Sequence, residues 1–299
     1  MSWQQLTLEA GAAEPERISA FLEARGAQSV TLLDAADQPL FEPDPGTTPL
    51  WQSTRITALF EASVDLAPVM QALIDAFGTD LAGQPEITLL EDRDWERVWL
   101  ERFQPMRFGE HLWICPAGQR PPAEPDQVLI DLDPGLAFGT GTHPTTALCL
   151  AWLDANAPHG LKVLDYGCGS GVLAIAALKL GAARAWGVDI DPQALLASAA
   201  NAAHNRVGER LNTGLPAQLA EAGFDVLLAN ILANPLVELA PKLAGLVKPG
   251  GQLVLSGILA DQADTVQHAY EPWFDFTPAV VQDGWARLQG VRHSAVDKG

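Results

Sequence analysis

The sequence lacks any long apolar run. No stretch of about 18 or more uninterrupted apolar residues, the usual requirement for a membrane-spanning helix, occurs in the chain. Its start, Met1-Ser2-Trp3-Gln4, has no basic stretch followed by an apolar one, as a secretory signal would. The 299 residues are nevertheless 48% hydrophobic, which is enough to bury one large core and one smaller one. We therefore expect a soluble, cytoplasmic protein.

Cysteines are scarce. The chain has three, Cys115, Cys149 and Cys168, and their spacing pairs none of them as metal ligands. An odd number without such spacing indicates neither a disulfide framework nor a zinc site. We expect no metal, and we expect the cysteines to be buried as small hydrophobic residues.

Positive charge is also scarce, with 18 lysines and arginines against 37 acidic residues and a net charge of −19. Such a surface repels phosphates, so we expect no direct binding to nucleic acid or to an anionic membrane. Residues 1–85 hold twelve acidic residues, no lysine, and only Arg17, Arg25 and Arg55, which gives −9. A basic partner is favoured, and ordinary acidic solubility is the alternative.

Residues 1–85 alternate short strand-like and helix-like stretches. Apolar residues recur with period two in the strand-like ranges and at helical spacing in the others. The pattern predicts strands at 3–8, 29–34 and 53–61 and helices at 15–25 and 66–77. This order predicts a small α+β domain of the split βαβ, ferredoxin-like kind. Phe41–Pro49 is so rich in turn-forming residues that we expect an exposed loop.

Residues 86–127 are predicted to connect two domains. Asp92–Phe103 has helical character, with Trp95 and Trp99 on one face, and Cys115–Pro125 is rich in proline. From residue 128 to 299, short apolar runs alternate with helical stretches rich in Ala and Leu. That texture predicts an α/β domain with a mostly parallel, Rossmann-like sheet.

A glycine-rich turn is the first candidate binding site. An apolar strand ends at Asp165, glycines follow at 167, 169 and 171, and a helix begins near Val172. Glycines allow the backbone to approach a ligand closely. The spacing differs from that of a dinucleotide-binding turn, and Asp165 would repel a diphosphate. A carboxylate can instead pair with a cationic amino-acid group.

Two further polar residues end predicted strands. Asp189 closes the strand that starts at Arg184, where an acid can accept both hydroxyls of a ribose, although a structural capping role is the alternative. Asn230 closes the apolar strand that starts at Phe224. Ligands of open α/β sheets bind at the carboxyl ends of the strands. We therefore expect Asp165, Asp189 and Asn230 to meet at one edge.

This order of motifs, completed by the turn Lys248-Pro249-Gly250-Gly251, resembles class I S-adenosylmethionine-dependent methyltransferases. Three longer blocks are more specific: 94–103, 132–146 and 230–236. They resemble the family of bacterial methyltransferases that modify ribosomal large-subunit protein eleven, and the resemblance extends from about residue 92 to residue 259.

The resemblance implies an enzyme that transfers methyl groups from S-adenosylmethionine to lysine side chains and the N-terminal amine of a ribosomal protein. It implies that the domain of residues 1–85 recognises the substrate, and that residues 128–299 form the methyltransferase domain. The cofactor-binding candidates are Phe138, Gly139, Thr140, Thr146, Asp165, Gly167, Gly169, Asp189 and Asn230. Asn230 is also the catalytic candidate, because its amide oxygen can hold an amine N–H and orient the nitrogen lone pair. His143, in the same block as Thr146, is read as a loop anchor or a functional group.

Three alternatives remain open at the level of sequence. A nicotinamide-dependent dehydrogenase would share the strand, turn and helix and the ribose-binding acid, but the glycine spacing and Asp165 disfavour it. A small-molecule methyltransferase would share the catalytic domain and leave the acidic first domain unexplained. A non-catalytic ribosome-assembly module would have no need of Asn230 and the glycine turn.

Overall fold

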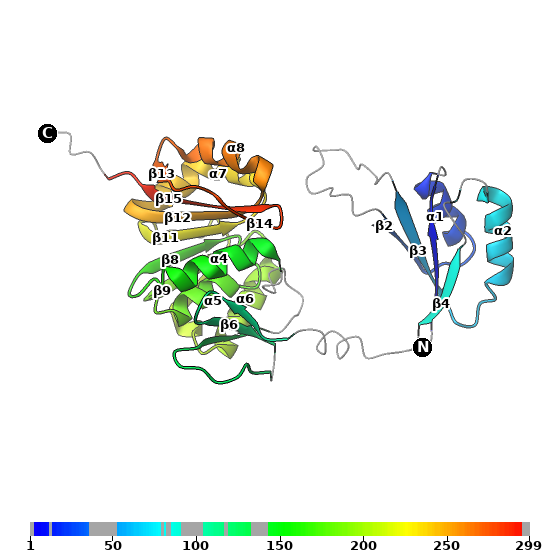
Figure 1. Ribbon diagram of the computed structural model, residues 1–299, viewed down its shortest axis with the longest axis horizontal. Coiled ribbons are helices and arrows are strands. Elements are labelled where there is room, and N and C mark those ends of the chain that lie inside the picture. Colours follow the sequence, from blue (N-terminus) through cyan, green and yellow to red (C-terminus); the bar gives the residue numbers. More distant parts are fainter. Residues whose placement is uncertain are drawn as a thin grey trace. The chain divides into compact units, whose positions relative to one another are not determined.

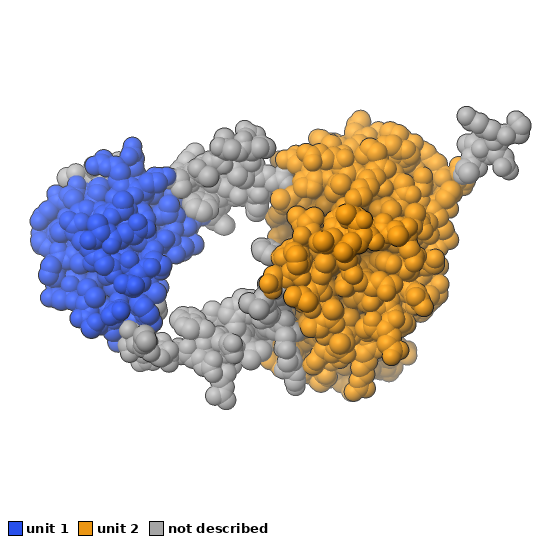
Figure 2. Space-filling view, turned by 180° about the vertical axis from the view of Figure 1, so that it is seen from behind, with its two compact units in different colours: residues 1–98 blue, residues 99–299 orange. Residues whose placement is uncertain are grey.

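The computed structural model describes residues 3–11, 14–35, 53–78, 81, 85–90, 104–116, 119–132 and 143–294. The chain forms two compact units, residues 1–98 and 99–299 (Figure 2). The two predicted segments Phe41–Pro49 and Asp92–Phe103 lie outside the described residues. Within the described ranges, no helix is long and apolar enough to cross a membrane.

The first unit is a four-stranded antiparallel sheet in the order β2-β3-β1-β4, with two helices (Figure 1). Its elements are β1 (Trp3–Glu9), α1 (Pro15–Glu23), β2 (Ser29–Asp34), β3 (Thr54–Glu61), α2 (Ala67–Phe77) and β4 (Glu86–Leu90). This order of strands and helices is the split βαβ arrangement that the sequence predicts.

The core of the first unit explains why these elements form. Alternate residues of β1 and β3 are buried, among them Leu6, Ile56 and Phe60. They pack with Ile18 of α1 and Leu73 of α2 in one hydrophobic cluster. Period-two burial in the strands and helical spacing in the helices therefore bring their apolar faces together.

The borders between domains differ from the predicted ones. Strand β4 pairs with β1, so the first unit continues beyond residue 85. Within the predicted connector 86–127, strands β5 (Met106–Phe108) and β6 (Leu112–Cys115) are ordered parts of the second unit. Leu112 and Ile114 are fully buried in its core, which is why this segment is more than a linker.

The second unit is built on an eight-stranded sheet in the order β10-β9-β8-β11-β12-β15-β13, with β14 beside β15. Strands β10, β9, β8, β11 and β12 are mutually parallel, and β15 is antiparallel to β12. The remaining helices and strands of the second unit are β7 (Val128–Asp131), α4 (Pro144–Ala155), β8 (Lys162–Tyr166), α5 (Val172–Lys179), β9 (Arg184–Val188), α6 (Pro192–His204), β10 (Leu211–Gly214), β11 (Phe224–Asn230), α7 (Ala233–Leu246), β12 (Val247–Leu259), α8 (Ala263–Tyr270), β13 (Phe274–Phe276), β14 (Val280–Gln282) and β15 (Trp285–Arg292).

Two hydrophobic clusters lie on opposite faces of this sheet. Helices α4, α5 and α6 contribute to one cluster, and α7 and α8 contribute to the other (Figure 1). Adjacent strand residues such as Val163 and Leu164 belong to different clusters. Both faces are covered, which confirms the predicted mostly parallel α/β sheet.

Strand β12 begins at Val247 and so includes the predicted turn Lys248-Pro249-Gly250-Gly251. Val247 pairs with Phe224 of β11, and the register shifts before Gln252 rejoins β11 opposite Val226. Lys248, in the Lys-Pro-Gly-Gly turn, forms an ion pair with Asp225 of β11. The turn is therefore fixed to the neighbouring strand and forms the first part of β12.

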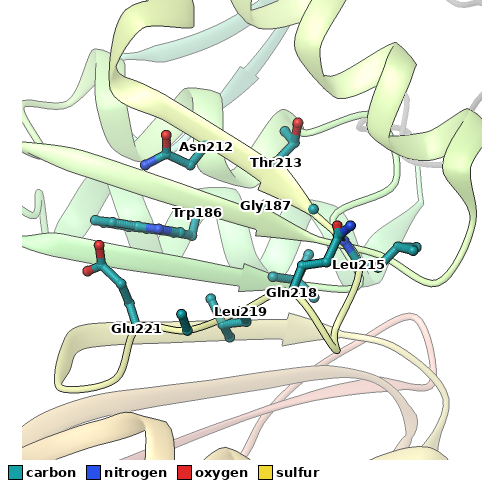
Figure 3. Close-up of a pocket in the computed structure, with 11 residues that line it drawn as sticks. Trp186, Gly187, Asn212, Thr213, Leu215, Gln218, Leu219 and Glu221 are labelled. Carbon is teal, nitrogen blue, oxygen red and sulfur yellow. The ribbon is translucent and has the colours of Figure 1, made fainter.

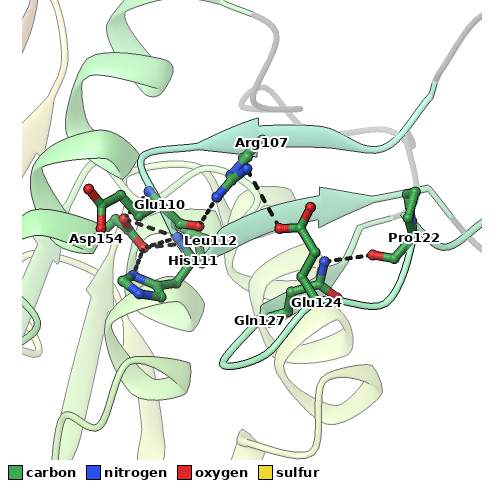
Figure 4. Close-up of polar contacts among 8 residues, drawn as sticks. All are labelled: Arg107, Glu110, His111, Leu112, Pro122, Glu124, Gln127 and Asp154. Carbon is green, nitrogen blue, oxygen red and sulfur yellow. Dashed lines mark hydrogen bonds and ion pairs between the residues drawn. The ribbon is translucent and has the colours of Figure 1, made fainter.

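A buried carboxylate holds the small sheet β5-β6-β7 against α4 (Figure 4). Asp154, whose side chain is 3% exposed, accepts hydrogen bonds from the backbone N–H groups of Glu110 (2.5 Å), His111 (3.2 Å) and Leu112 (3.0 Å). Gly109, at φ 74°, begins the turn that joins β5 to β6. A Cβ atom at this position would overlap the Asp154 carboxylate. One side chain thus satisfies three backbone donors that the turn leaves unpaired.

We expect Asp154→Ala to lower the free energy of unfolding by about 2–3 kcal/mol, because it removes the charged acceptor of three backbone N–H groups. Urea unfolding followed by circular dichroism measures this change. Asp264→Ala, at an exposed site in the first turn of α8, is the matched control, expected within about 0.5 kcal/mol of the unmodified protein. Equal unfolding midpoints for the two variants would contradict this role of Asp154.

Candidate active site

The glycine turn joins β8 to α5 in a conformation that requires glycine. Gly167 and Gly171 have φ values of 82° and 79°, in the left-handed region. A Cβ atom at Gly171 would lie 2.8 Å from Ser198 Oγ, and one at Gly167 would overlap the Ile231 side chain. The N–H of Gly167 donates to the carbonyl of Val188 in β9 (2.7 Å). The turn is therefore packed between β9 and the segment that follows β11.

Asp165 lies under this turn and is 1% exposed. Its Oδ2 accepts a hydrogen bond from the backbone N–H of Ala174 in α5 (3.1 Å), and its Oδ1 has no hydrogen-bond partner among the described residues. Burial raises the pKa of Asp165 to about 7; the Ala174 bond opposes this shift, and the nearby Asp189 charge adds to it. A buried oxygen without a partner is costly, and a hydrogen-bond donor or positive charge would satisfy it.

This raised pKa predicts how stability depends on pH. The folded state binds the Asp165 proton more tightly than the unfolded chain, in which the pKa is near 3.8. The resulting contribution to stability is complete below pH 3.8, is lost as pH rises towards about 7, and then stays constant. Asp165→Asn cannot ionise, so its stability relative to the unmodified protein should increase across that window. Parallel unfolding curves at pH 4, 5.5 and 7 measure this; a stability difference that does not change with pH would contradict it.

Asp189 immediately follows β9 and reaches the glycine turn. Its Oδ2 accepts a hydrogen bond from the N–H of Gly169 (2.9 Å), and its Oδ1 accepts one from the N–H of Asp191 (3.0 Å). The N-cap of α6 is Asp191, which accepts from the N–H of Gln193 (2.9 Å), with Pro192 at the first helical position. The capping role therefore belongs to Asp191, and Asp189 is tied to the glycine turn.

Asn230, the last residue of β11, contacts the first turn of α4. Its side-chain N–H donates to Thr146 Oγ1 (3.2 Å), and Thr146 is 3% exposed. An amide has separate donor and acceptor atoms, so this bond leaves the Asn230 carbonyl oxygen to accept from another group. The bond therefore sets the direction in which that oxygen points.

His143 caps α4 at this edge of the sheet. Its ring accepts from the N–H of Thr145 (3.4 Å), and the ring packs edge-on against Trp285, with centroids 4.7 Å apart. Burial lowers the pKa of His143, which favours the neutral ring that a cap requires. The structure thus gives His143 the role of an anchor for the start of α4.

The structure brings most of the predicted site residues together. Gly169 and Asp189 are hydrogen-bonded, Asp165 lies beneath the turn, and the turn contacts Ile231, next to Asn230. All lie at or beside the carboxyl ends of β8, β9 and β11. The remaining three predicted cofactor residues, Phe138, Gly139 and Thr140, lie outside the described residues.

The model of the ribosomal protein L11 methyltransferase family matches residues 2–293. The chain belongs to this family. It is 55% identical to the ribosomal protein L11 methyltransferase of Methylococcus capsulatus over 98% of this chain and all of that one. It is 54% identical to the one of Hahella chejuensis, over 98% of this chain and 99% of that one.

A solved structure supports the same fold. The crystal structure of the ribosomal protein L11 methylase of Lactobacillus delbrueckii subsp. bulgaricus is 35% identical, with a TM-score of 0.59, and is matched over 64% of this chain and 100% of that one. These comparisons confirm the predicted class I methyltransferase fold and the predicted resemblance to the methyltransferases of ribosomal protein L11.

The cysteines of this L11 methyltransferase family member are buried and free, as the sequence predicts. Cys168 lies within the glycine turn, with its Sγ 3.4 Å from Ser198 Oγ. Burial raises the pKa of Cys168 to about 12, and the nearby Asp165 charge also raises it. The thiol is therefore protonated at neutral pH and serves packing.

A hollow of about 350 Å³ lies on the outer part of the sheet (Figure 3). It lies between β9 and β10 and the segment 215–221, and Trp186, Asn212, Leu219 and Glu221 line it. Val188 and Gly214 are also in its lining, and the N–H of Asp189 donates to the Gly214 carbonyl (3.4 Å). If a ligand's ribose were bound by Asp189, the group attached to that ribose would have room in this hollow.

Two residues at the glycine turn were missed from the sequence. Ser198 and Asn201 of α6 donate to backbone carbonyls of the turn. The sequence did contain a signal for these contacts. Ser198 and Asn201 are three residues apart on a helix otherwise rich in alanine, and this spacing places both on one face.

Proposed function

We propose that this family member transfers methyl groups from S-adenosylmethionine to lysine side chains and the N-terminal amine of ribosomal protein L11. The observation that carries the proposal is the hydrogen bond from Gly169 to Asp189, which joins the glycine turn of β8 to the acid after β9. The family membership supports the reaction and the substrate.

The residues at the glycine turn fit the parts of this cofactor. Asp189 has a carboxylate that can accept ribose hydroxyls, and the glycines leave no Cβ atoms in the way. The buried Asp165, with an unpartnered Oδ1, supplies negative potential for an ammonium group. The hollow beside Val188 and Gly214 offers room for the adenine ring. We assign Phe138, Gly139, Thr140 and Thr146 to the same binding site.

Asn230 is the group we assign to the amine. When bound, S-adenosylmethionine supplies a methyl carbon on a positively charged sulfur. The nitrogen lone pair of the amine attacks this carbon from the side opposite the sulfur, and the sulfur leaves as a neutral thioether. Asn230, held by Thr146, can accept one N–H of the amine and direct that lone pair. A lysine must first lose a proton from its ammonium, whose pKa is normally about 10.4. Asn230 therefore contributes positioning, which can supply a large part of the rate.

We assign substrate recognition to the first unit. The three arginines of residues 1–85 are already engaged: Arg55 with Glu9 (3.0 Å), Arg25 over the Phe21 ring (3.3 Å) and Arg17 over the Phe77 ring (5.9 Å). Residues 1–85 carry twelve acidic residues against these three arginines, and this excess of negative charge suits a basic partner. A ribosomal protein is expected to be basic, because it binds the phosphates of RNA. We also place the enzyme in the cytoplasm, without direct binding to nucleic acid or membrane.

Calorimetry with S-adenosylmethionine tests the cofactor assignment. We expect the full chain to bind S-adenosylmethionine and not NADH, and Asp189→Ala to weaken binding by about 10- to 100-fold, because two charge-assisted hydrogen bonds are lost. Asp264→Ala is the control for removing a carboxylate. Binding of NADH alone would reject the assignment, and unchanged binding by Asp189→Ala would remove Asp189 from the site.

Incubation with labelled S-adenosylmethionine and purified L11 tests the reaction itself. Mass mapping of labelled peptides should find methyl groups on lysine side chains and the N-terminal amine. Cofactor binding without any label in L11, or in a total ribosomal protein fraction, would leave the cofactor assignment standing and reject the proposed substrate.

A further inference from the structure

Helix α6 carries a continuous set of polar side chains along one side (α6 in Figure 1). Ser198 and Asn201 are three residues apart, and Asn205, at the C-cap, follows four residues later. This spacing places all three on one face of the helix. Ser198 is fully buried and Asn205 is 3% exposed, so their polar atoms need partners within the protein.

The first two residues of this set hold the carbonyl side of the glycine turn. Ser198 Oγ donates to the carbonyl of Gly169 (2.8 Å), and Asn201 Nδ2 donates to the carbonyl of Ser170 (2.9 Å). The N–H of Gly169 is donated to Asp189. Two successive peptide units of the turn are therefore oriented by α6 on one side, and the acid just ahead of α6 holds the same turn.

Asn205 fixes the opposite end of the helix to β7. Its Oδ1 accepts from the N–H of Asp131 (2.8 Å), and its Nδ2 donates to the carbonyl of Asp131 (2.6 Å) and to that of Asn201 (2.9 Å). The amide thus pairs with both backbone groups of one residue, as a neighbouring strand would. The Asp131 carboxylate in turn binds Arg120 through two contacts, of 2.5 and 3.1 Å.

We propose that Ser198, Asn201 and Asn205 act as one unit that positions the glycine turn for S-adenosylmethionine. Asn205, whose hydrogen bonds go to Asp131 and Asn201, sets cofactor affinity from the far end of α6. The mechanism is preorganisation, because a turn held from α6 and from Asp189 does not have to be ordered when the ligand binds. This inference rests on the proposed placement of the cofactor at the glycine turn.

Calorimetry on full-length variants tests the near end of the unit. Ser198→Ala should weaken S-adenosylmethionine binding about fivefold, the equivalent of one hydrogen bond. Tyr270→Phe is the matched control, because it also removes a buried hydroxyl that donates to a backbone carbonyl, that of Leu236 (2.8 Å), but in the α7–α8 cluster. Tyr270→Phe should lower the melting temperature and leave the Kd unchanged.

Asn205→Ala tests the far end. It should weaken cofactor binding by a similar factor, and the double variant Ser198→Ala/Asn205→Ala should weaken it less than the product of the two effects, because residues that act as a unit are not additive. If Asn205→Ala does not fold, Asn205→Asp, which keeps an acceptor for the Asp131 N–H and loses both donated hydrogen bonds, takes its place with the same expectation. Cofactor affinity within twofold of the unmodified protein in all these variants, with lowered melting temperatures, would overturn the proposal.

The Asp189→Ala measurement separates the two levels of inference. Loss of affinity with Asp189→Ala but not with the α6 variants would reject only the role of α6. Unchanged affinity in every variant, Asp189→Ala included, would reject the placement of the cofactor and the role of α6 together.

Discussion

Replacement of Asn230 by alanine is expected to lower kcat by about 100- to 1000-fold, the size of effect seen when one preorganised polar group is removed from an active site. The cofactor Kd should change far less, because the interaction with the amine is strongest in the transition state. The physical reason is the position of Asn230, at the end of β11 beside the glycine turn, with its amide oriented by Thr146. Single-turnover methylation of L11 at saturating cofactor measures the change.

Two further variants make this result specific. Thr146→Val removes the hydroxyl that accepts the Asn230 N–H but keeps the shape of the side chain, so it should give an intermediate loss of kcat. Asn156→Ala removes another asparagine amide, which donates to the Trp152 carbonyl (2.9 Å) at the far end of α4. It should leave kcat within about twofold, because it lies outside the site. Equal rates for Asn230→Ala and Asn156→Ala would assign Asn230 a structural role.

The sequence predicted the elements whose physical signals are local. β2 and β11 have the predicted boundaries, and β9 and α2 differ from them by one residue at an end. Period-two and helical patterns report directly on burial against a sheet or a helix. The positions of Asp165, Asp189 and Asn230 followed from strand ends, because parallel strands bring their carboxyl ends to one edge of a sheet.

Features that depend on distant parts of the chain were not predicted. The pairing of β4 with β1 joins residues 79 to 87 positions apart, from Thr7 with Glu86 to Trp3 with Leu90, so the strand was assigned to the connector. The Asp154 carboxylate that fixes the turn before β6 lies more than forty residues away from it. Asn205 joins Asp131 across 74 positions. Polar side chains that bind backbone groups of remote segments leave no periodic pattern in the sequence. An asparagine at the end of a predicted helix is therefore interpreted equally well as a helix cap as a long-range contact.

Charge on the first unit provides a prediction in the full-length enzyme. Neutralising the exposed Glu16 and Glu23 of α1 to glutamine should lower kcat/KM for L11 severalfold and leave the cofactor Kd unchanged. The loss should fade at high salt, since the Debye length is only about 3 Å at 1 M. Glu238→Gln and Asp264→Asn, on exposed sites of α7 and α8, are the matched control pair. An equal loss with both pairs would point to net charge rather than to the first unit.

Removal of residues 1–98 is expected to abolish methylation of L11 while cofactor binding stays nearly intact. The second unit has its own two hydrophobic clusters, and every assigned cofactor residue follows Leu132, so the catalytic fold does not depend on the first unit. Without that unit the substrate must find Asn230 by unassisted collision, and the advantage of a tethered binding site, an effective concentration that reaches the millimolar range for short linkers, is lost. The truncated enzyme should therefore methylate free lysine or a short basic peptide at the same slow rate as the full chain. Parallel assays with L11 and with the peptide separate loss of substrate recognition from loss of folding. Loss of both activities would indicate that the truncated protein is misfolded, which its circular dichroism and cofactor Kd would reveal. Full activity on L11 would reject substrate recognition by the first unit.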